Sequence, residues 1–340
     1  MQQMFLWRQW LFTGGIALSL LASPGCSQKP EPAPAPKSTP PSQPGQLFDA
    51  KSYVDFGTAN GAKGDLDTAI GAFNEAIRVS PKYAPAYYNR GYAHVLQNKP
   101  DEAISDFDQA IQIDPAYKQA YYQRGSLKGK KGDFDGAISD FSQVIKLDPK
   151  YAPAYYIRGN AHYFKGDLDD ALKDINQALS LDPNFAYSYF IRGLIRHAQG
   201  HRAEATSDFQ KSAGLNFPYA TFWVWITEME DGRHDLARKD LSDALAKPQS
   251  FKPDDGPSQI TNFLLDKITL DQLIAKARTG NGAESNNRLC EAWFYAGMSK
   301  RLSGDAKGAQ DCFAKAIATE SKGSEEFVEA NREAAELQKP

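Results

Sequence analysis

The stretch Tyr87-Tyr88-Asn89-Arg90-Gly91, with Ala103, Phe107, Ala110 and Asp114-Pro115 downstream, decides the fold of this 340-residue chain. Its landmarks return every 34 residues. Glycine does so five times, each time four residues after a tyrosine, at Gly57, Gly91, Gly125, Gly159 and Gly193. Alanine, a large apolar residue and proline follow in the same register, as at Ala137, Phe141 and Pro149. A period of this length predicts a stack of helical hairpins.

One 34-residue unit can be interpreted physically as two packed helices. Small residues, Gly91 and Ala103, stand where the two helices approach closely, and Tyr87 and Phe107 fill the space around them. Pro115 ends the second helix, because its ring and missing N–H cannot continue the hydrogen-bond ladder. A single hairpin leaves an apolar face bare, so neighbouring hairpins must stack into one continuous body.

The composition excludes some classes of protein. Lys and Arg total 39 against 42 Asp and Glu, a net charge of −3, which lacks the basic footprint of a nucleic-acid binder. The chain has only three cysteines, Cys26, Cys290 and Cys312, too few for a disulfide framework. Cys290 and Cys312 fall in two helices of one predicted hairpin. A bridge between them demands close geometry, and buried free thiols are the alternative.

The N-terminal segment has the pattern of a signal peptide, with Arg8 before an apolar run too short to span a membrane comfortably. The tetrapeptide Ser23-Pro24-Gly25-Cys26 then resembles a bacterial lipobox, although leucine usually stands where this chain has Ser23. The resemblance implies that Cys26 becomes the lipidated first residue, and that Ser27 directs the protein to an outer membrane. Secretion without lipidation is the alternative.

The chain is expected to divide into five segments. Residues 1–25 form the signal peptide, and residues 26–46 a lipidated tether whose many prolines favour extended polyproline II. Five good repeats occupy residues 47–218. Register degrades after Pro218, so residues 219–289 are interpreted as degenerate helical hairpins, and residues 290–340 as a final repeat with a capping helix.

The recurring aromatic, glycine, alanine, aromatic and proline resemble the tetratricopeptide repeat. This resemblance implies an all-α fold, a right-handed superhelix (α-solenoid) of about eight helical hairpins with a C-terminal capping helix. It also implies a concave surface that binds a peptide or a partner's helix.

The second half is similar to the NlpI-type lipoproteins, on the segments Glu291-Ala292-Trp293-Phe294-Tyr295-Ala296-Gly297 and Phe327-Val328-Glu329. Such proteins are anchored in the outer membrane and bring periplasmic proteases and peptidoglycan hydrolases to their targets. The resemblance implies protein partners in the cell envelope, a membrane contact through the N-terminal lipid, and a homodimer as one form of assembly.

Two charged columns run through the repeats. An arginine precedes the glycine of four repeats, and an aspartate stands sixteen residues after each arginine; the residues are Arg90, Arg124, Arg158 and Arg192, with Asp106, Asp140, Asp174 and Asp208. The first repeat has Phe56 and Ala72 at these positions. Because the first repeat lacks both the arginine and the aspartate, the two columns predict a structural charge pair within each hairpin. A row of arginines that binds an acidic ligand is the alternative.

The resemblance also places a peptide groove, because the fifth, ninth and twelfth positions of each first helix line the family's concave face. Here they are Tyr88, Tyr122, Tyr156 and Phe190, then Tyr92, Asn160 and Leu194, then Tyr163 and His197. The core tyrosine of each repeat is its direct neighbour, about 100° away around the helix. We therefore expect this column to meet solvent or a ligand. Packing between neighbouring hairpins is the alternative interpretation.

Motifs of enzyme chemistry are absent from the sequence: it has no Walker loop, H-E-x-x-H, C-x-x-C or G-x-S-x-G stretch. His197 and His201 are four residues apart but lack further ligands nearby, so neither a metal nor a cofactor is expected.

The sequence thus predicts a non-enzymatic, lipid-anchored scaffold or adaptor at the outer membrane, facing the periplasm. The alternatives are an envelope-assembly or secretion factor that holds client polypeptides as a chaperone does, and, more weakly, an unrecognised hydrolase.

Overall fold

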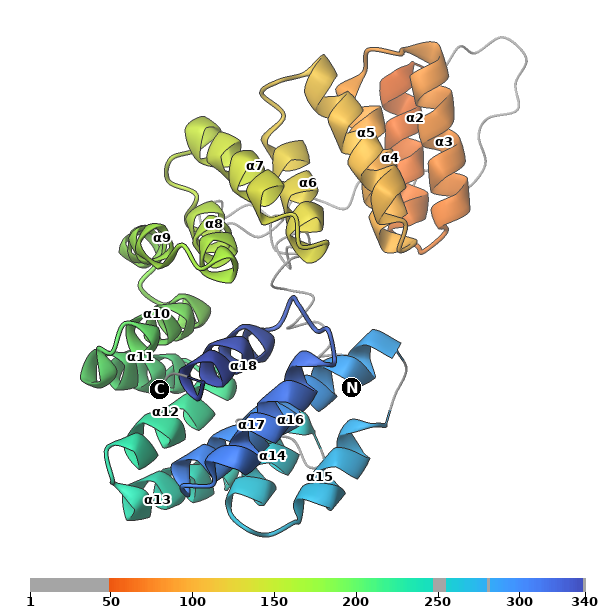
Figure 1. The fold of residues 1–340 in the computed structure, drawn as a ribbon. Helices are drawn as coiled ribbons and strands as arrows, with labels where there is room; N and C mark the ends of the chain where they lie inside the picture. The colour runs from red at the N-terminus through yellow and green to blue at the C-terminus, as the bar shows by residue number, and fades with distance from the viewer. Residues whose placement is uncertain (1–48, 247–254, 280–281, 339–340) are drawn as a thin grey trace. The chain divides into compact units, whose positions relative to one another are not determined.

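The computed structural model describes residues 49–246, 255–279 and 282–338, and all regular structure in these ranges is helical (Figure 1). The expected all-α architecture is confirmed, with eight consecutive helix pairs followed by one terminal helix. The pairs are α2 (Ala50–Gly61) and α3 (Leu66–Val79), α4 (Ala84–Leu96) and α5 (Pro100–Ile113), α6 (Lys118–Lys130) and α7 (Phe134–Leu147), α8 (Ala152–Lys165) and α9 (Leu168–Leu181), α10 (Ala186–Ala198) and α11 (Arg202–Gly214), α12 (Tyr219–Glu230) and α13 (His234–Leu245), α14 (Gly256–Leu264) and α15 (Leu270–Ala277), and α16 (Gly282–Leu302) and α17 (Ala306–Ile317). The terminal helix is α18 (Glu325–Glu336).

The described residues form two compact units, unit 1 up to residue 161 and unit 2 from residue 162, with the boundary inside α8. Each unit is a stack of hairpins. The signal peptide, Cys26 and the tether lie outside the described residues. No helix of the described ranges combines the length and hydropathy needed to cross a membrane.

Turn chemistry explains where the second helix of a hairpin begins. At the α6–α7 turn, Gly132 adopts a φ of 80°, a left-handed conformation that side chains disfavour. The carboxylate of the next residue, Asp133, then accepts a hydrogen bond of 2.9 Å from the Gly136 backbone N–H and caps α7. The same cap recurs at Asp65 and Asp305, so three of the second helices begin at a capping aspartate.

The repeated glycine permits the close approach of the two helices in each hairpin. A Cβ built on Gly193 would lie 2.5 Å from the ring of Phe209, and one built on Gly297 would lie 2.5 Å from the ring of Phe313. These contacts are shorter than side-chain atoms tolerate, so the phenylalanine ring occupies the space that the glycine leaves.

Replacing Gly193 with alanine should therefore lower the stability of unit 2 by about 2 to 3 kcal/mol, because the methyl group overpacks a filled core. The matched control is Gly71→Ala. Gly71 is an exposed glycine inside α3 with no atom within 4 Å of its built Cβ. There the change should add about 0.5 to 1 kcal/mol. Urea unfolding measures both, and equal effects at the two sites would contradict this account.

The degenerate half of the chain is held together by aromatic contacts between helices far apart in sequence. Trp223 of α12 stacks on Phe294 of α16 at 5.8 Å between ring centroids, and Phe222 lies 4.9 Å from Tyr295. Where the 34-residue pattern is lost, this dense aromatic core therefore holds the helices of unit 2 together.

Cys290 and Cys312 are buried free thiols, so no disulfide bond forms between them.

Candidate functional site: the faces of the first helices

The structure forms three of the four predicted charge pairs. Arg90 donates to both carboxylate oxygens of Asp106, at 3.0 and 2.6 Å, and Arg192 does the same to Asp208, at 2.8 and 2.7 Å. Arg124 and Asp140 form an equivalent two-bonded pair. Asp106, Asp140 and Asp208 are all buried, so these charges stabilise the hairpins and are not available to a ligand. The fourth pair, Arg158 with Asp174, falls on both sides of the unit boundary and stays a prediction.

Each arginine also reaches the second helix of the preceding hairpin, which the sequence analysis missed. The remaining nitrogen donates to a residue sixteen positions earlier, at 2.7 Å for Arg90 and 3.0 Å for Arg192. These acceptors form a column of their own: Asn74, Asp108, Ser142 and Asn176. A search for polar residues in the 34-residue register would have found it. The arginine therefore joins neighbouring hairpins as well as the helices of one hairpin.

A second cation accompanies the arginine, four residues after it. Lys128 lies 3.0 Å from Asp140, and Arg196 lies 2.7 Å from Asp208. In the α4–α5 hairpin the equivalent residue is His94, 3.8 Å from the Asp106 carboxylate. The column His94, Lys128, His162 and Arg196 is visible in the sequence as a basic residue at 34-residue steps. Asp140 and Asp208 therefore each contact two cations.

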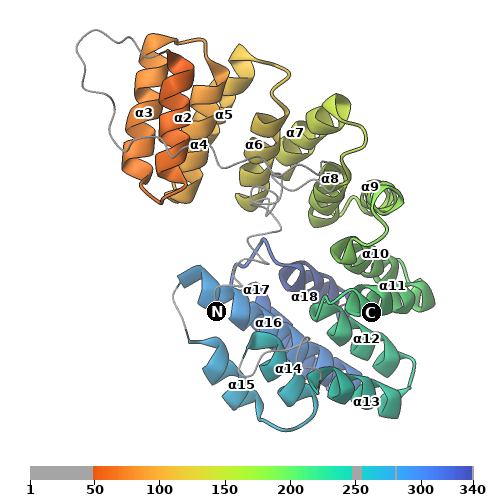
Figure 2. The same cartoon turned by 180° about the vertical axis from the view of Figure 1, so that it is seen from behind.

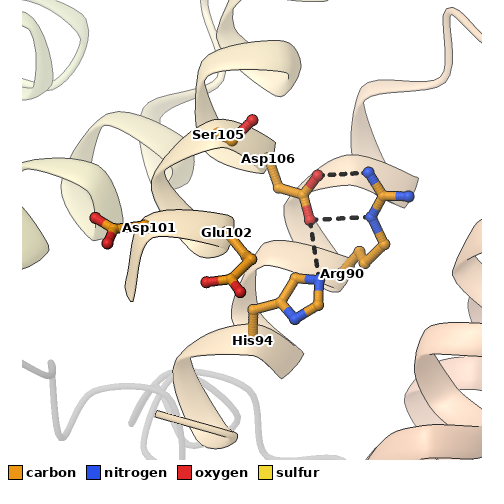
Figure 3. A pocket seen from close by; sticks show the side chains of 6 residues that line it. All are labelled: Arg90, His94, Asp101, Glu102, Ser105 and Asp106. Carbon is orange, nitrogen blue, oxygen red and sulfur yellow. Dashed lines mark hydrogen bonds and ion pairs between the residues drawn. The ribbon is translucent and has the colours of Figure 1, made fainter. Parts of the chain in front are cut away.

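Figure 3 shows the open hollow of about 510 Å³ between α4 and α5, where one such cluster lies. It is lined by Arg90, His94, Asp101, Glu102, Ser105 and Asp106. The dashed contacts join the Asp106 carboxylate to Arg90 and His94, so its charge is already compensated. In this hollow the polar groups hold α4 and α5 of the hairpin together. Among the described residues, no group of three His, Cys, Asp or Glu side chains could hold a metal ion.

In unit 1 the expectation that the groove column meets solvent or a ligand is wrong for Tyr122, Tyr156 and Asn160. Their exposed fractions are 9%, 4% and 1%. Tyr122 packs edge-on against Phe141 at 5.5 Å and against Tyr151, the residue just before the next first helix, at 6.0 Å. The connecting segment of the next hairpin therefore covers the ring, and this burial raises the pKa of Tyr122.

Two members of the column, Tyr88 and Tyr92, remain half-buried. The Tyr88 ring lies 5.8 Å from Phe107 and 5.1 Å from Tyr117. Burial raises the pKa of Tyr88 to about 12. These two tyrosines keep part of their surface accessible, and their role in binding a ligand stays a prediction.

In unit 2 the expected exposure is also wrong for Tyr163, Phe190 and Leu194, which are all buried. Phe190 packs 4.9 Å from Phe217 and 5.9 Å from Phe209 within its own hairpin and the turn that follows. The sequence could not show this burial, because the covering residues belong to other elements.

The terminal helix α18 packs against α17 and α16 of unit 2. Figures 1 and 2 also draw it beside α10 and α12. The Tyr163 hydroxyl, near the end of α8, donates to Glu329, and the Tyr187 hydroxyl of α10 donates to Glu325. Arg301 of α16 donates to Glu333. The acidic face of α18, defined by Glu325, Glu329 and Glu333, thus contacts three different helices.

His197, the last groove residue predicted from sequence, lies in the same region. Its Nε2 is 2.9 Å from the Glu230 carboxylate of α12, and its ring packs edge-on against Trp223 at 5.3 Å. Arg301 approaches the same carboxylate at 3.5 Å. His197 therefore belongs to a half-buried network of charges rather than to a solvent-exposed groove wall.

Comparison with protein families identifies the repeats between residues 61 and 185. The tetratricopeptide repeat model matches residues 84–117 and 152–185, and a second model, described as TPR repeat, matches residues 61–98 and 129–166. The chain contains tetratricopeptide repeats. A comparison with curated proteins finds no match.

Several solved structures are similar to part of the chain. A crystal structure of MamA is 28% identical, covers 47% of this chain and 94% of its own, and has a TM-score of 0.46. Residues 41 to the end of MamA from Desulfovibrio magneticus RS-1 are 22% identical, with coverages of 49% and 94% and a TM-score of 0.47. YrrB, described as a TPR protein with an unusual peptide-binding site, is 22% identical, with coverages of 49% and 86% and a TM-score of 0.46.

Burial shifts the pKa values of the acid–base groups beside α18 in unit 2. Burial raises the pKa of Glu333 to about 7, although Arg301 acts in the opposite direction. Burial opposes the charge of His197, but the hydrogen bond to Glu230 outweighs it and raises the pKa of His197. Glu230 is the opposite case: burial is overcome by His197, Arg301 and Arg202, and the pKa of Glu230 is lowered.

These shifts predict that unit 2 loses stability as the pH rises from 6 to 8. Glu333, with a raised pKa, stabilises the fold fully below its ordinary value and loses that contribution as pH rises through about 7. The pKa of His197 is also raised, so its contribution to stability is likewise lost as the pH rises. Glu230, with a lowered pKa, loses its contribution only as pH falls through its folded-state value. The expected loss is about 1 to 2 kcal/mol.

Amide hydrogen exchange of α18 at pH 6 and pH 8, corrected for the intrinsic rate, measures this loss. Glu333→Gln, which removes the ionisable group and keeps its shape, should flatten most of the pH dependence. Protection of α18 that is unchanged or greater at pH 8 would contradict the assignment.

Proposed function

We propose that this protein is a non-enzymatic adaptor that binds protein partners through its tetratricopeptide repeats. The observation that supports the proposal is α18 itself, because the first helices of unit 2 already hold a helical segment through side chains directed at its carboxylates. The half-buried Tyr88 and Tyr92 of unit 1 offer a second accessible area on a first helix. Aromatic and hydroxyl groups of this kind suit recognition of polypeptide.

The cellular setting is part of the same proposal. The signal-peptide pattern, the Gly25-Cys26 junction and the Pro-rich segment after it support an adaptor anchored by lipid to the outer membrane and facing the periplasm. From that position the repeats would recruit envelope proteases or peptidoglycan hydrolases.

Affinity capture from solubilised membranes, followed by mass spectrometry, tests the adaptor role. We expect a few stoichiometric partners whose recovery falls when Tyr88 and Tyr92 are both replaced by alanine. The matched control replaces Lys63 and Lys82, two exposed lysines outside this area, by alanine. Capture of a broad set of unfolded clients would favour a chaperone instead. Turnover of peptidoglycan or peptide by the purified protein would contradict a non-enzymatic role.

A separate prediction concerns the anchor. Replacing Cys26 with alanine should move the protein from the membrane fraction to the soluble periplasmic fraction and remove a metabolic lipid label. Two acyl chains give stable attachment, whereas a single chain gives only marginal membrane binding. Cys290→Ala is the matched control, because this buried thiol cannot carry the lipid. Unchanged membrane association of the Cys26 variant would place the anchor elsewhere.

A further inference from the structure

The terminal helix α18 packs against α16 and α17, and most of its fully buried residues are acidic. Four of its residues are buried, and three of them are glutamates: Glu326, Glu329 and Glu333, with Ala330 as the fourth. The preceding helix α17 buries only apolar residues and a thiol: Ala309, Cys312, Phe313 and Ala316. Apolar burial is the usual source of helix docking energy, and α18 has little of it on this face.

The surface that receives α18 matches its acidic residues one by one. Glu325, Glu329 and Glu333 are spaced by four residues, so they lie along one face of the helix. Their partners, Tyr187, Tyr163 and Arg301, come from α10, α8 and α16. In addition, the Arg332 guanidinium of α18 lies 4.8 Å over the Tyr163 ring. We call Tyr163, Tyr187 and Arg301 the acidic-helix dock.

An acidic helix of another protein would form the same charge-assisted hydrogen bonds with these three side chains. It can therefore compete with α18 for this surface. The advantage of α18 is the short connection from Ile317 to Glu325, which keeps it at a high local concentration.

We infer that the acidic-helix dock is a binding surface for an acidic helix of a protein partner, with carboxylates at every fourth residue, and that α18 is the chain's own displaceable occupant. This inference rests on the proposed adaptor function and names its ligand class. A second copy of this chain is a poorer occupant, because exchange of α18 between copies would form the same contacts and gain none.

The test uses a fluorescent peptide with the sequence of residues 322–338 and the full-length protein. In the receptor variant Glu325→Gln/Glu329→Gln/Glu333→Gln the internal helix loses its three acidic contacts and keeps its shape. We expect the peptide to bind this variant about tenfold or more tightly than it binds the unchanged protein, since charge-assisted hydrogen bonds no longer hold the competitor.

Two controls define the surface. A peptide with the same three glutamates changed to glutamine should bind at least about tenfold more weakly. Adding Tyr187→Phe and Arg301→Gln to the receptor variant should remove binding of the acidic peptide. Should the receptor variant fold poorly, the unchanged protein is challenged with excess peptide, and the exchange protection of its own α18 amides should fall.

Equal binding of the acidic and glutamine peptides would overturn the inference, as would an α18 that stays fully protected under saturating peptide. Dimers that form by exchange of α18, detected by light scattering, would overturn the assignment to a foreign partner. If the acidic peptide does not bind while membrane capture still recovers stoichiometric partners, only this inference is wrong. If capture fails while the peptide binds, the dock stands and the proposed adaptor role falls.

Discussion

Replacing Asp140 with alanine is expected to destabilise unit 1 by about 3 kcal/mol, because two half-buried cations lose the buried carboxylate that they share. Asp140 is 2% exposed and accepts hydrogen bonds from Arg124, with Lys128 at 3.0 Å from the same carboxylate. Asp108 is the matched control, since it also binds Arg124 but its side chain is 50% exposed. Asp108→Ala should cost less than about 1 kcal/mol.

A double-mutant cycle separates the pair from the helix that carries it. Arg124→Ala in the Asp140→Ala background should restore part of the lost stability, because the guanidinium then no longer lies beside the vacated site. Denaturant unfolding of the four proteins gives the coupling energy. A coupling energy near zero, or a loss for Asp108→Ala as large as that for Asp140→Ala, would dismiss the buried pair as a structural element.

Replacing Tyr122 with alanine is the second large effect, expected at about 3 to 5 kcal/mol, as for other buried aromatic side chains. The ring is buried between Phe141 and Tyr151, so its removal leaves a cavity between two hairpins. Tyr156→Ala should act in the same direction, because Tyr156 is 4% exposed. Tyr122→Phe, which keeps the ring, should cost no more than about 1 kcal/mol.

Thermal unfolding followed by circular dichroism measures these changes, with partner capture as a parallel readout. If Tyr122→Ala left the melting temperature unchanged and abolished capture, the ring would be a ligand contact rather than packing. The structure predicts the reverse, a fall in melting temperature.

Several features could be predicted from the sequence because they repeat. Gly193 and Phe209 lie sixteen residues apart, as do Arg192 and Asp208, and both pairs meet across a single hairpin. The geometry of one hairpin is local, so a periodic pattern carries it directly. The same register also contained the acceptor column and the second cation, which become readable once the arginine is known to bridge neighbouring hairpins.

The groove column shows where such reasoning ends. Helical geometry correctly separates Tyr122 from its neighbour Tyr121, but it does not say what covers the second ring. Tyr151 covers it, and Tyr151 lies in a connecting segment whose path depends on how two hairpins stack. Whether a side chain is exposed depends on the residues packed around it, and those residues do not lie in the sequence of its own helix.

The sequence by itself determined the repeat, the helix starts and ends, the small contacts at glycine and the charge pairs within hairpins, because each depends on residues close in the chain. Only the tertiary structure decided that the tyrosine column is packed and that α18 lies on the first helices of unit 2. Tyr187 and Glu325 are 138 residues apart, and Tyr163 and Glu329 are 166 apart. Whether these residues come into contact depends on how every hairpin between them is rotated relative to the one before. No local sequence pattern contains that information.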